Sequence, residues 1–281
     1  GIRDKLVTGV QTCALPICGM LNSVGIPSDG AAGFVRRLLP EYRAWRPPTI
    51  VSLGGLSEDE YFVAAERLAG VQGIAAFEVN VSCPNLEAGG HELGAVPAAV
   101  ERVIRGVVDR TALPVIAKLT PNVTSIADIA RAAEAGGASA VTAINAVLGL
   151  AVDARTRQAK IGTTTGGLTG PAIKPIALRC VWQASRAVKI PVIGAGGIAT
   201  VDDVIEFLLV GATAVQVGSA TFTRPDTMLR LIDGLAARLV ADGVAAVAEL
   251  TGGLKVGPAR HDLGGVLDAS APETVSPVPR W

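Results

Sequence analysis

The chain has 281 residues, of which 49% are hydrophobic and 18% charged, and its formal net charge is +0. This length and composition predict one large α/β domain, and the even charge offers neither a basic stripe for nucleic acid nor a charged tail for a partner. The longest apolar stretches, such as 241–250, contain acidic residues and are too short to span a bilayer. We therefore expect no binding to nucleic acid or to membranes.

The first 18 residues follow neither a helical nor a strand period and lack the order of regions of a signal peptide. The run 7–17 resembles the translation of a sequencing adapter. We therefore expect that 1–18 is a foreign leader in place of the true N-terminus, with a genuine leader as the alternative.

From about residue 48 onward, short apolar strands alternate with longer helices. Strands bounded by Gly or Pro are expected at 49–53, 76–81, 114–119, 138–144, 191–195 and 212–217. Helices are expected at 57–69, 97–110, 125–135, 171–187, 201–209 and 226–241. Such alternation is typical of parallel strands joined by crossover helices.

Two glycine motifs distinguish a barrel from a doubly wound sheet. The last two expected strands run into Gly194-Ala-Gly-Gly-Ile198 and Gly218-Ser-Ala220. Glycine N–H groups after the seventh and eighth strands form the usual phosphate site of a TIM barrel. We therefore predict an α/β fold of the (β/α)8 TIM-barrel type, lacking its first two strands and spanning residues 19–253.

The last segment, 254–281, is rich in Gly and Pro and poor in large apolar residues, so we expect a flexible tail. His261 lies in this tail and is interpreted as solvated. His91 lies in the polar loop 86–94, which has the composition of a gate, and it is interpreted as a loop residue.

The four cysteines, Cys13, Cys18, Cys83 and Cys180, follow no paired metal spacing, and we expect no metal site. Their low density does not indicate a disulfide-rich secreted domain, so a reducing cytoplasm is the expected location. Cys180 stands at helical spacing among apolar residues and is predicted to pack in the core.

Residues 80–85, Asn-Val-Ser-Cys-Pro-Asn, place the thiol of Cys83 between two carboxamides at the end of an apolar strand. The ends of parallel strands are where α/β folds keep their chemistry. A carboxamide offers donors and an acceptor, so Asn80 and Asn85 suit a planar ligand with imide and acid edges. A cysteine that only packs, and asparagines that only form turns, are the plainer alternatives.

Motifs along the chain resemble those of the class I dihydroorotate dehydrogenases, in the same order and over roughly residues 19–253. The sequence at 145–153 and at 170–174 favours the B-type catalytic subunit within that family. The motifs that carry the resemblance are Asn80-Val-Ser-Cys-Pro-Asn85, Ala117-Lys-Leu-Thr-Pro-Asn122, Ile144-Asn145, Gly166-Gly-Leu-Thr-Gly-Pro-Ala-Ile-Lys-Pro175, Gly194-Ala-Gly-Gly-Ile198 and Gln216-Val-Gly-Ser219.

The resemblance implies oxidation of dihydroorotate to orotate in pyrimidine biosynthesis, with flavin mononucleotide (FMN) as the hydride acceptor. It assigns the general base to Cys83, whose thiol needs help to ionise because a free thiol titrates near pH ~8.5. It also implies substrate contacts from a loop at 19–26 and from strand ends. These implied substrate residues are Asn22, Ser23, Val24, Gly25, Ile26, Asn80, Asn85, Asn145 and Ala146.

The resemblance further implies an FMN site, with a cation, Lys118, beside the flavin. Lys118 lies inside an apolar strand, where an unpaired charge is costly; a buried ion pair is the structural alternative. The excursion 147–169 is long for a barrel loop and is expected to cover part of the site. The implied cofactor residues are Ser52, Asn80, Lys118, Ile144, Gly170, Gly196, Gly197, Gly218 and Ser219.

Three positions depart from the family pattern. Ser52 stands where the family often has an asparagine, and Ala146 replaces a hydroxyl residue. The family's lysine that contacts both flavin and substrate is expected upstream of residue 19, and Lys5 matches no such motif.

The resemblance implies a dimer of catalytic chains joined to a partner subunit that carries FAD and a 2Fe-2S cluster and passes electrons to NAD. The chain itself has no four-cysteine cluster motif and no dinucleotide fingerprint opening its first strand. Two alternatives stay open: a related flavin barrel acting on other pyrimidines, as in dihydropyrimidine dehydrogenases, and an inactive truncated chain.

Overall fold

A six-stranded parallel sheet forms the centre of the computed structural model, which describes residues 13–15, 19–25, 27–82 and 93–256. The strand order is β12-β11-β6-β5-β4-β3, so each strand after β3 is added on the same side of its predecessor, as in a barrel. The strands are β3 (Ile50–Leu53), β4 (Ala76–Asn80), β5 (Val115–Leu119), β6 (Ala140–Ala143), β11 (Val192–Ala195) and β12 (Ala214–Gln216).

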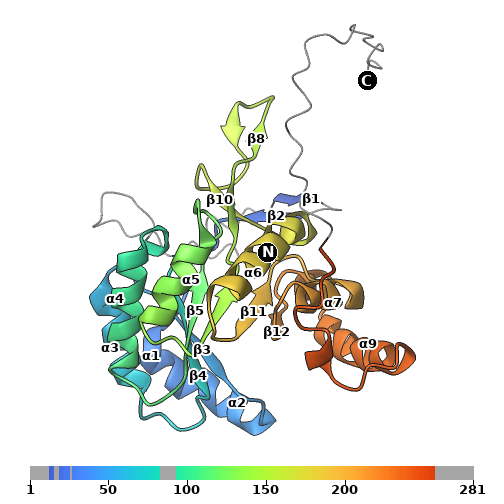
Figure 1. Ribbon diagram of the computed structural model, residues 1–281. Helices are drawn as coiled ribbons and strands as arrows, with labels where there is room; N and C mark the ends of the chain where they lie inside the picture. The colour runs from blue at the N-terminus through green and yellow to red at the C-terminus, as the bar shows by residue number, and fades with distance from the viewer. Residues whose placement is uncertain (1–12, 16–18, 26, 83–92, 257–281) are drawn as a thin grey trace, which may run out of the picture.

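Helices cover the outer face of this sheet (Figure 1). The strand residues that point outward, such as Phe77 and Val79, are fully buried against them together with Ile104 and Phe207. The helices that follow the strands are α3 (Glu58–Leu68), α4 (Pro97–Val108), α5 (Ile126–Ala135), α6 (Lys174–Ala187), α7 (Val201–Leu209) and α9 (Thr227–Ala241), with the short α8 (Ala220–Thr223) before α9. All expected strands and helices of the alternating region are therefore confirmed.

The inward-pointing residues form two layers of different character. Ala76, Ile116 and Ala140 are buried and pack with Ile193 as a small apolar cluster. Two residues further along β4, β5 and β6, the next side chains on the same face are Glu78, Lys118 and Thr142, which are polar. The inside of the curled sheet is thus apolar at the amino ends of its strands and polar toward their carboxyl ends.

A second, antiparallel sheet of order β1-β2-β10-β7 lies outside the alternating pattern. Leu21 of β2 pairs with Leu168 of β10, and β10 pairs in turn with β7, the strand that follows β6. Its strands are β1 (Cys13–Leu15), β2 (Gly19–Asn22), β7 (Val147–Gly149) and β10 (Gly166–Thr169). The excursion 147–169 therefore begins and ends in this sheet, and its middle, β8 (Val152–Asp153) and β9 (Gln158–Ala159), forms a hairpin that projects from the body (Figure 1).

Before β3 the chain forms a helical segment that the sequence did not predict: α1 (Gly30–Gly33), a π-helical stretch at Phe34–Leu38, and α2 (Leu39–Trp45). Short 3-10 helices occur at Leu93–Ala95, Pro171–Ile173 and Val247–Glu249. Across the described ranges, no helix combines the length and hydropathy needed to cross a membrane.

The parallel sheet is open between β3 and β12. Neither outer edge pairs with another strand within the described residues, and a groove of about 490 Å³ lies between them, with α9 along it. Its apolar lining includes Ile50 of β3 and Met228, Ile232 and Leu235 of α9. The predicted fold, a (β/α)8 barrel without its first two strands, is confirmed as this six-stranded partial barrel.

Candidate active site

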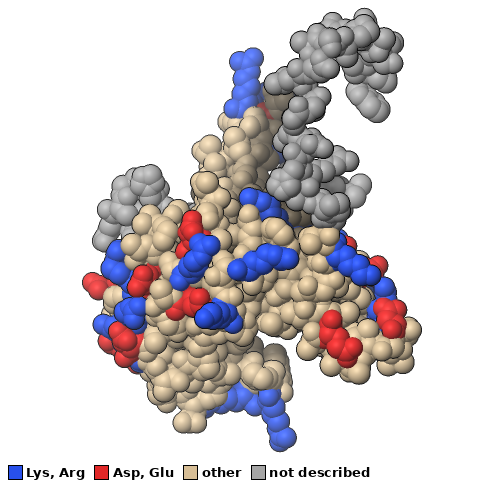
Figure 2. Space-filling model, viewed as in Figure 1, with Lys and Arg blue, Asp and Glu red and all other residues tan. Residues whose placement is uncertain are grey.

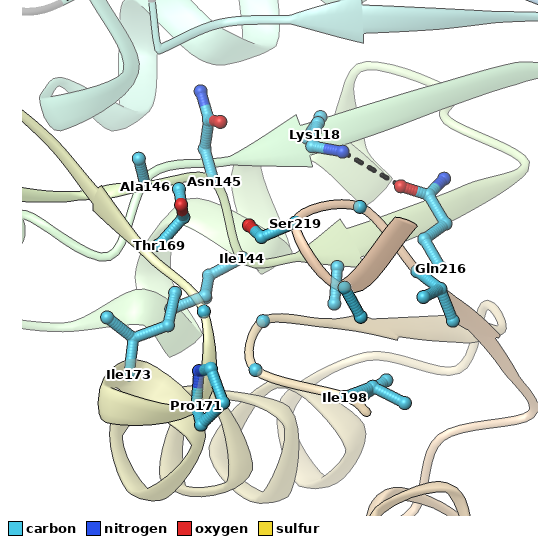
Figure 3. A pocket seen from close by; sticks show the side chains of 17 residues that line it. Lys118, Ile144, Asn145, Ala146, Thr169, Pro171, Ile173, Ile198, Gln216 and Ser219 are labelled. Carbon is cyan, nitrogen blue, oxygen red and sulfur yellow. Dashed lines mark hydrogen bonds between the residues drawn. The ribbon is translucent and has the colours of Figure 1, made fainter. Parts of the chain in front are cut away.

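A cavity of about 270 Å³ lies at the carboxyl ends of β5, β6, β11 and β12, where α6 and α8 begin (Figure 3). Apolar side chains, among them Ile144, Ile173 and Ile198, form part of its wall, and Lys118 and Gln216 add polar groups. Residues from several strand ends meet here because parallel strands place their carboxyl ends at the same edge. The cavity is lined by Lys118, Ile144, Asn145, Ala146, Thr169, Gly170, Pro171, Ile173, Ala195, Gly196, Gly197, Ile198, Gln216, Val217, Gly218, Ser219 and Ala220.

The two glycine motifs line one part of this cavity. Gly196 and Gly197 have φ angles of 126° and 81°, which side chains other than glycine rarely adopt. Among the described residues, the backbone N–H groups of Gly196, Gly197, Gly218 and Ser219 donate to no protein acceptor. Four such N–H groups around one cavity form a site suited to an anion such as a phosphate.

Close packing also requires glycine at position 197. A Cβ atom built there would lie 2.8 Å from Cβ of Lys174 and 2.9 Å from the carbonyl oxygen of Gly170. Gly218 is different, because a Cβ atom there would meet nothing within 4 Å. The chain thus brings α6 against the Gly196–Gly197 turn, whereas the space beside Gly218 is open.

An ionic cluster joins the starts of α6 and α7 behind that turn. Lys174 Nζ lies 2.6 Å from Asp203 Oδ1 and 2.8 Å from Glu206 Oε2. The other oxygen of Asp203 accepts the backbone N–H groups of Ala199 and Thr200, which follow the turn. The hydrogen bond to Asp203, and then that to Glu206, raise the pKa of Lys174. Burial opposes ionisation of Asp203, but its hydrogen bonds from Lys174, Ala199 and Thr200 together lower its pKa.

Four polar side chains from four strands form a hydrogen-bonded layer, of which Lys118 and Gln216 line the cavity. Glu78 accepts from Thr142 Oγ1 at 2.7 Å, from Gln216 Nε2 at 2.5 Å and from Lys118 Nζ at 3.3 Å. Lys118 Nζ also donates to Gln216 Oε1 at 2.8 Å (Figure 3). Lys118 is therefore part of a buried ion pair, the structural alternative, and it also lines the cavity; its position beside a flavin stays a prediction.

A group of carboxamides lies beside this layer. Asn145 Nδ2 donates to Asn80 Oδ1 at 3.1 Å, and the N–H of Ser82 donates to the same oxygen at 3.2 Å. Asn122 Nδ2 donates to the carbonyl of Ala146 at 3.3 Å, which ties the end of β5 to the chain after β6. The side chain of Asn80 thus contacts Asn145, which lines the cavity. In the sequence, Asn80 precedes Cys83 by three positions.

The structure brings most of the predicted cofactor residues together. Lys118, Ile144, Gly170, Gly196, Gly197, Gly218 and Ser219 all line the cavity, as do the predicted substrate residues Asn145 and Ala146. Asn80 is not part of the lining but contacts Asn145, and Ser52 lies instead in the groove between β3 and β12.

The predicted substrate loop is partly described. Asn22 Nδ2 donates to the carbonyl of Gly167 at 3.2 Å, so this side chain joins β2 to β10. Ser23, Val24 and Gly25 follow, and Val24 is exposed. Cys83, Asn85, Ile26, His91 and residues 86–92 of the expected gate lie outside the described residues, as do Lys5 and His261.

Sequence reasoning missed two members of the hydrogen-bonded polar layer. From the sequence, Gln216 is identified only as part of the motif Gln216-Val-Gly-Ser219, and Glu78 is not predicted as a site residue. Both were detectable by the argument applied to Lys118, because each is a polar side chain between two large apolar neighbours in a strand. Cys180, predicted to pack in the core, is confirmed as buried, and burial raises the pKa of its thiol.

Comparison with known proteins adds independent evidence. The sequence model of the dihydroorotate dehydrogenase family matches residues 13–239. A dihydroorotate dehydrogenase B (NAD(+)) catalytic subunit from Solidesulfovibrio magneticus is 46% identical over 241 residues, 85% of this chain and 79% of that protein. A protein of the same description from Desulforamulus reducens is 45% identical over 234 residues, 83% of this chain and 77% of that protein.

Among solved structures, a DHODH from Eimeria tenella in complex with ferulenol matches with a TM-score of 0.68. The match covers 84% of this chain and 71% of that one, at 20% sequence identity. At this identity the match supports the fold alone.

Proposed function

The chain belongs to the dihydroorotate dehydrogenase family, and we propose on that basis that it oxidises dihydroorotate to orotate in pyrimidine biosynthesis. The observation that carries the proposal is the cavity, where unpaired glycine N–H groups, a lysine and a carboxamide meet at the carboxyl ends of the strands. The reaction removes a proton from one ring carbon and a hydride from its neighbour.

FMN is the cofactor that this cavity suits. The N–H groups of Gly196, Gly197, Gly218 and Ser219 would hold its phosphate, and Ile144 and the other apolar wall residues would contact its ring. Lys118 would place a positive charge beside the ring. When bound, FMN supplies the hydride acceptor.

Cys83 is the proposed base. It follows the last residue of β4, Asn80, by three positions in the sequence, and as a thiolate it would take the proton from the substrate ring carbon. Asn80 and Asn145 would pair with the substrate, since their carboxamides offer both donors and acceptors. The proposed further substrate contacts are Asn22, Ser23, Val24, Gly25, Ile26, Asn85 and Ala146, and Ser52 and Gly170 are proposed further contacts to the cofactor.

The proposed electron acceptor is NAD, reached through a separate subunit that carries FAD and a 2Fe-2S cluster. The descriptions of the related catalytic subunits, which include NAD(+), support this route. We further propose that two catalytic chains associate, and that residues 19–253 form the catalytic unit.

The test is anaerobic reduction of the flavin in the purified chain loaded with FMN. Dihydroorotate should bleach the flavin absorbance, whereas Cys83→Ala should bind FMN equally well and bleach about 10²–10⁴-fold more slowly, as expected for loss of a general base. Cys180→Ala is the matched control, because this cysteine is buried on α6 and should leave the rate unchanged.

Three results would contradict the proposal. One is a folded chain that takes up no FMN. Another is equal rates for Cys83→Ala and the unaltered chain. The third is turnover of dihydrouracil or thymine without turnover of dihydroorotate, which would indicate the related dihydropyrimidine chemistry.

A further inference from the structure

The inner wall of the partial barrel contains a charged residue that the proposed reaction does not use. The interior of a TIM barrel is usually filled with bulky branched side chains. Here Glu78 points inward from β4 and is only 6% exposed. Burying a carboxylate is costly unless it is paired and hydrogen-bonded, so its contacts should explain its presence.

The contacts of Glu78 fix the orientation of two cavity residues. Gln216 donates a hydrogen bond from its amide NH₂ to the Glu78 carboxylate, and its amide oxygen accepts one from the Lys118 ammonium. The reverse orientation would direct the amide oxygen at the carboxylate and the NH₂ at the ammonium, so only one orientation satisfies both charges. Within the described residues, Glu78 and Gln216 use two of the three N–H donors of Lys118, which leaves one for a ligand in the cavity.

We propose that Glu78 is a positioning residue that holds the Lys118 ammonium and the Gln216 amide in place at the cavity wall, and that it thereby sets how strongly Lys118 favours the reduced flavin. The second part rests on the proposed function. Glu78 contacts the cavity only through Lys118 and Gln216, because it is not among the residues that line it.

The charges determine the direction of the effect. Glu78 partly offsets the positive charge of Lys118, whose side chain is 20% exposed. Replacing Glu78 by Gln preserves size and removes the negative charge, so the ammonium should favour an added negative charge in the cavity more strongly. The same substitution frees the ammonium from its partner.

The first experiment needs no cofactor: the reaction of Lys118 with acetic anhydride in the apoprotein, followed by peptide mass spectrometry. In Glu78→Gln, Lys118 should react about tenfold faster, since a hydrogen bond between charged groups that restrains it is lost. Thr142→Val is the control, because it removes a donor to Glu78 but leaves the hydrogen bonds of Lys118 to Glu78 and Gln216 in place; Thr142 is the register partner of Lys118 on β6 but makes no hydrogen bond to it within the described residues. Equal labelling of Lys118 in unaltered chain and folded Glu78→Gln would overturn the proposal.

A stability measurement covers the case in which Glu78→Gln does not fold. The double variant Glu78→Gln/Lys118→Met removes both charges, and neutral replacement of a buried pair is often tolerated where loss of one partner is not. Recovery of the cooperative unfolding transition in the double variant would support the coupling of Glu78 to Lys118. A double variant that is as unstable as Glu78→Gln would overturn it.

The second experiment measures the midpoint potential of bound FMN. Glu78→Gln should raise it by about 30 mV, the equivalent of a tenfold change for a two-electron couple, and Thr142→Val should leave it unchanged. An unchanged potential in Glu78→Gln, or an equal rise in Thr142→Val, would overturn the effect on the flavin. A chain that binds no FMN would contradict the proposed function, whereas the labelling of Lys118 would still decide the role of Glu78.

Discussion

Gly197 is the residue at which backbone conformation and close packing coincide. Its φ of 81° and the approach of Lys174 and the Gly170 carbonyl both exclude a side chain. We therefore predict that Gly197→Ala destabilises the chain by about 1–3 kcal/mol and abolishes FMN uptake, because the turn must move out of place. Denaturant unfolding and flavin fluorescence measure the two effects.

Gly218→Ala is the matched control for this prediction, because Gly218 lines the same cavity but has free space around it. It should unfold at the same denaturant concentration as the unaltered chain. If Gly218→Ala is as unstable as Gly197→Ala, the close packing behind Gly197 is not the cause.

The same contrast shows what the sequence could predict at the residue scale. A lysine in an apolar strand and glycines at two strand ends were sufficient to select Lys118, Gly196, Gly197 and Gly218, because each breaks the local pattern. The position of Ser52 could not be predicted, because it depends on the open edge between β3 and β12. Partners such as Glu78 with Gln216, 138 positions apart, become visible only when the sheet is assembled.

At the scale of elements, the start of α7 shows how a helix end supports the cavity. Asp203 completes a capping box with Thr200, accepts the N–H of Ala199 and pairs with Lys174 of α6. Because Ala199 follows the Gly196–Gly197 turn closely, this carboxylate ties the turn to two helices. Loss of the Asp203 side chain should therefore loosen the turn as well as the helix.

We predict that Asp203→Ala lowers the free energy of unfolding by about 2 kcal/mol at pH 7, since a cap and a charged hydrogen bond are lost. The pKa of Asp203 is lowered in the folded chain from its ordinary value of 3.8. Its contribution is therefore fully present above that value and is lost as the pH falls through the folded pKa. The difference between variant and unaltered chain should shrink below pH ~4.

Asp202→Ala is the control for this prediction. Asp202 lies in the same first turn, but its side chain is 75% exposed and, in the part of the chain that the structure describes, pairs with Arg238 alone. Exposed pairs of this kind contribute little, so the expected loss is below about 1 kcal/mol at any pH. An equal loss in both variants would show that acidic charge in the first turn, rather than the contacts of Asp203, stabilises α7.

Elements were predictable where their burial is regular. The strands and helices from β3 to α9 alternate with clear periods, and the structure confirms them to within a few residues. The second sheet was not predictable, because β2, β7 and β10 are short, each contains glycine, and β2 pairs with β10 across more than a hundred positions. Neither was the helical segment Gly30–Trp45, whose first turns contain two glycines.

At the scale of the whole molecule, the parallel sheet has an open side between β3 and β12. Charged residues are spread over the face in Figure 2, with no single-sign patch. By contrast, Ile50 and Ile232 in the groove between β3 and β12 are 47% and 64% exposed, next to two strand edges that pair with no other strand among the described residues. Unpaired edges with exposed apolar side chains promote pairing between chains.

We therefore predict that the purified chain self-associates as its concentration rises, and that a lysine in the groove prevents it. Ile50→Lys and Ile232→Lys should each weaken self-association by about tenfold or more, because each removes a large apolar side chain from the contact and adds charge beside an edge strand. Sedimentation velocity over a concentration series measures the self-association.

Val240→Lys is the control, since Val240 is on the same helix as Ile232 and 82% exposed but does not line the groove. If it weakens association as much as Ile232→Lys does, general surface charge is responsible, whereas a selective effect of Ile50 and Ile232 would assign the association to the open side of the barrel.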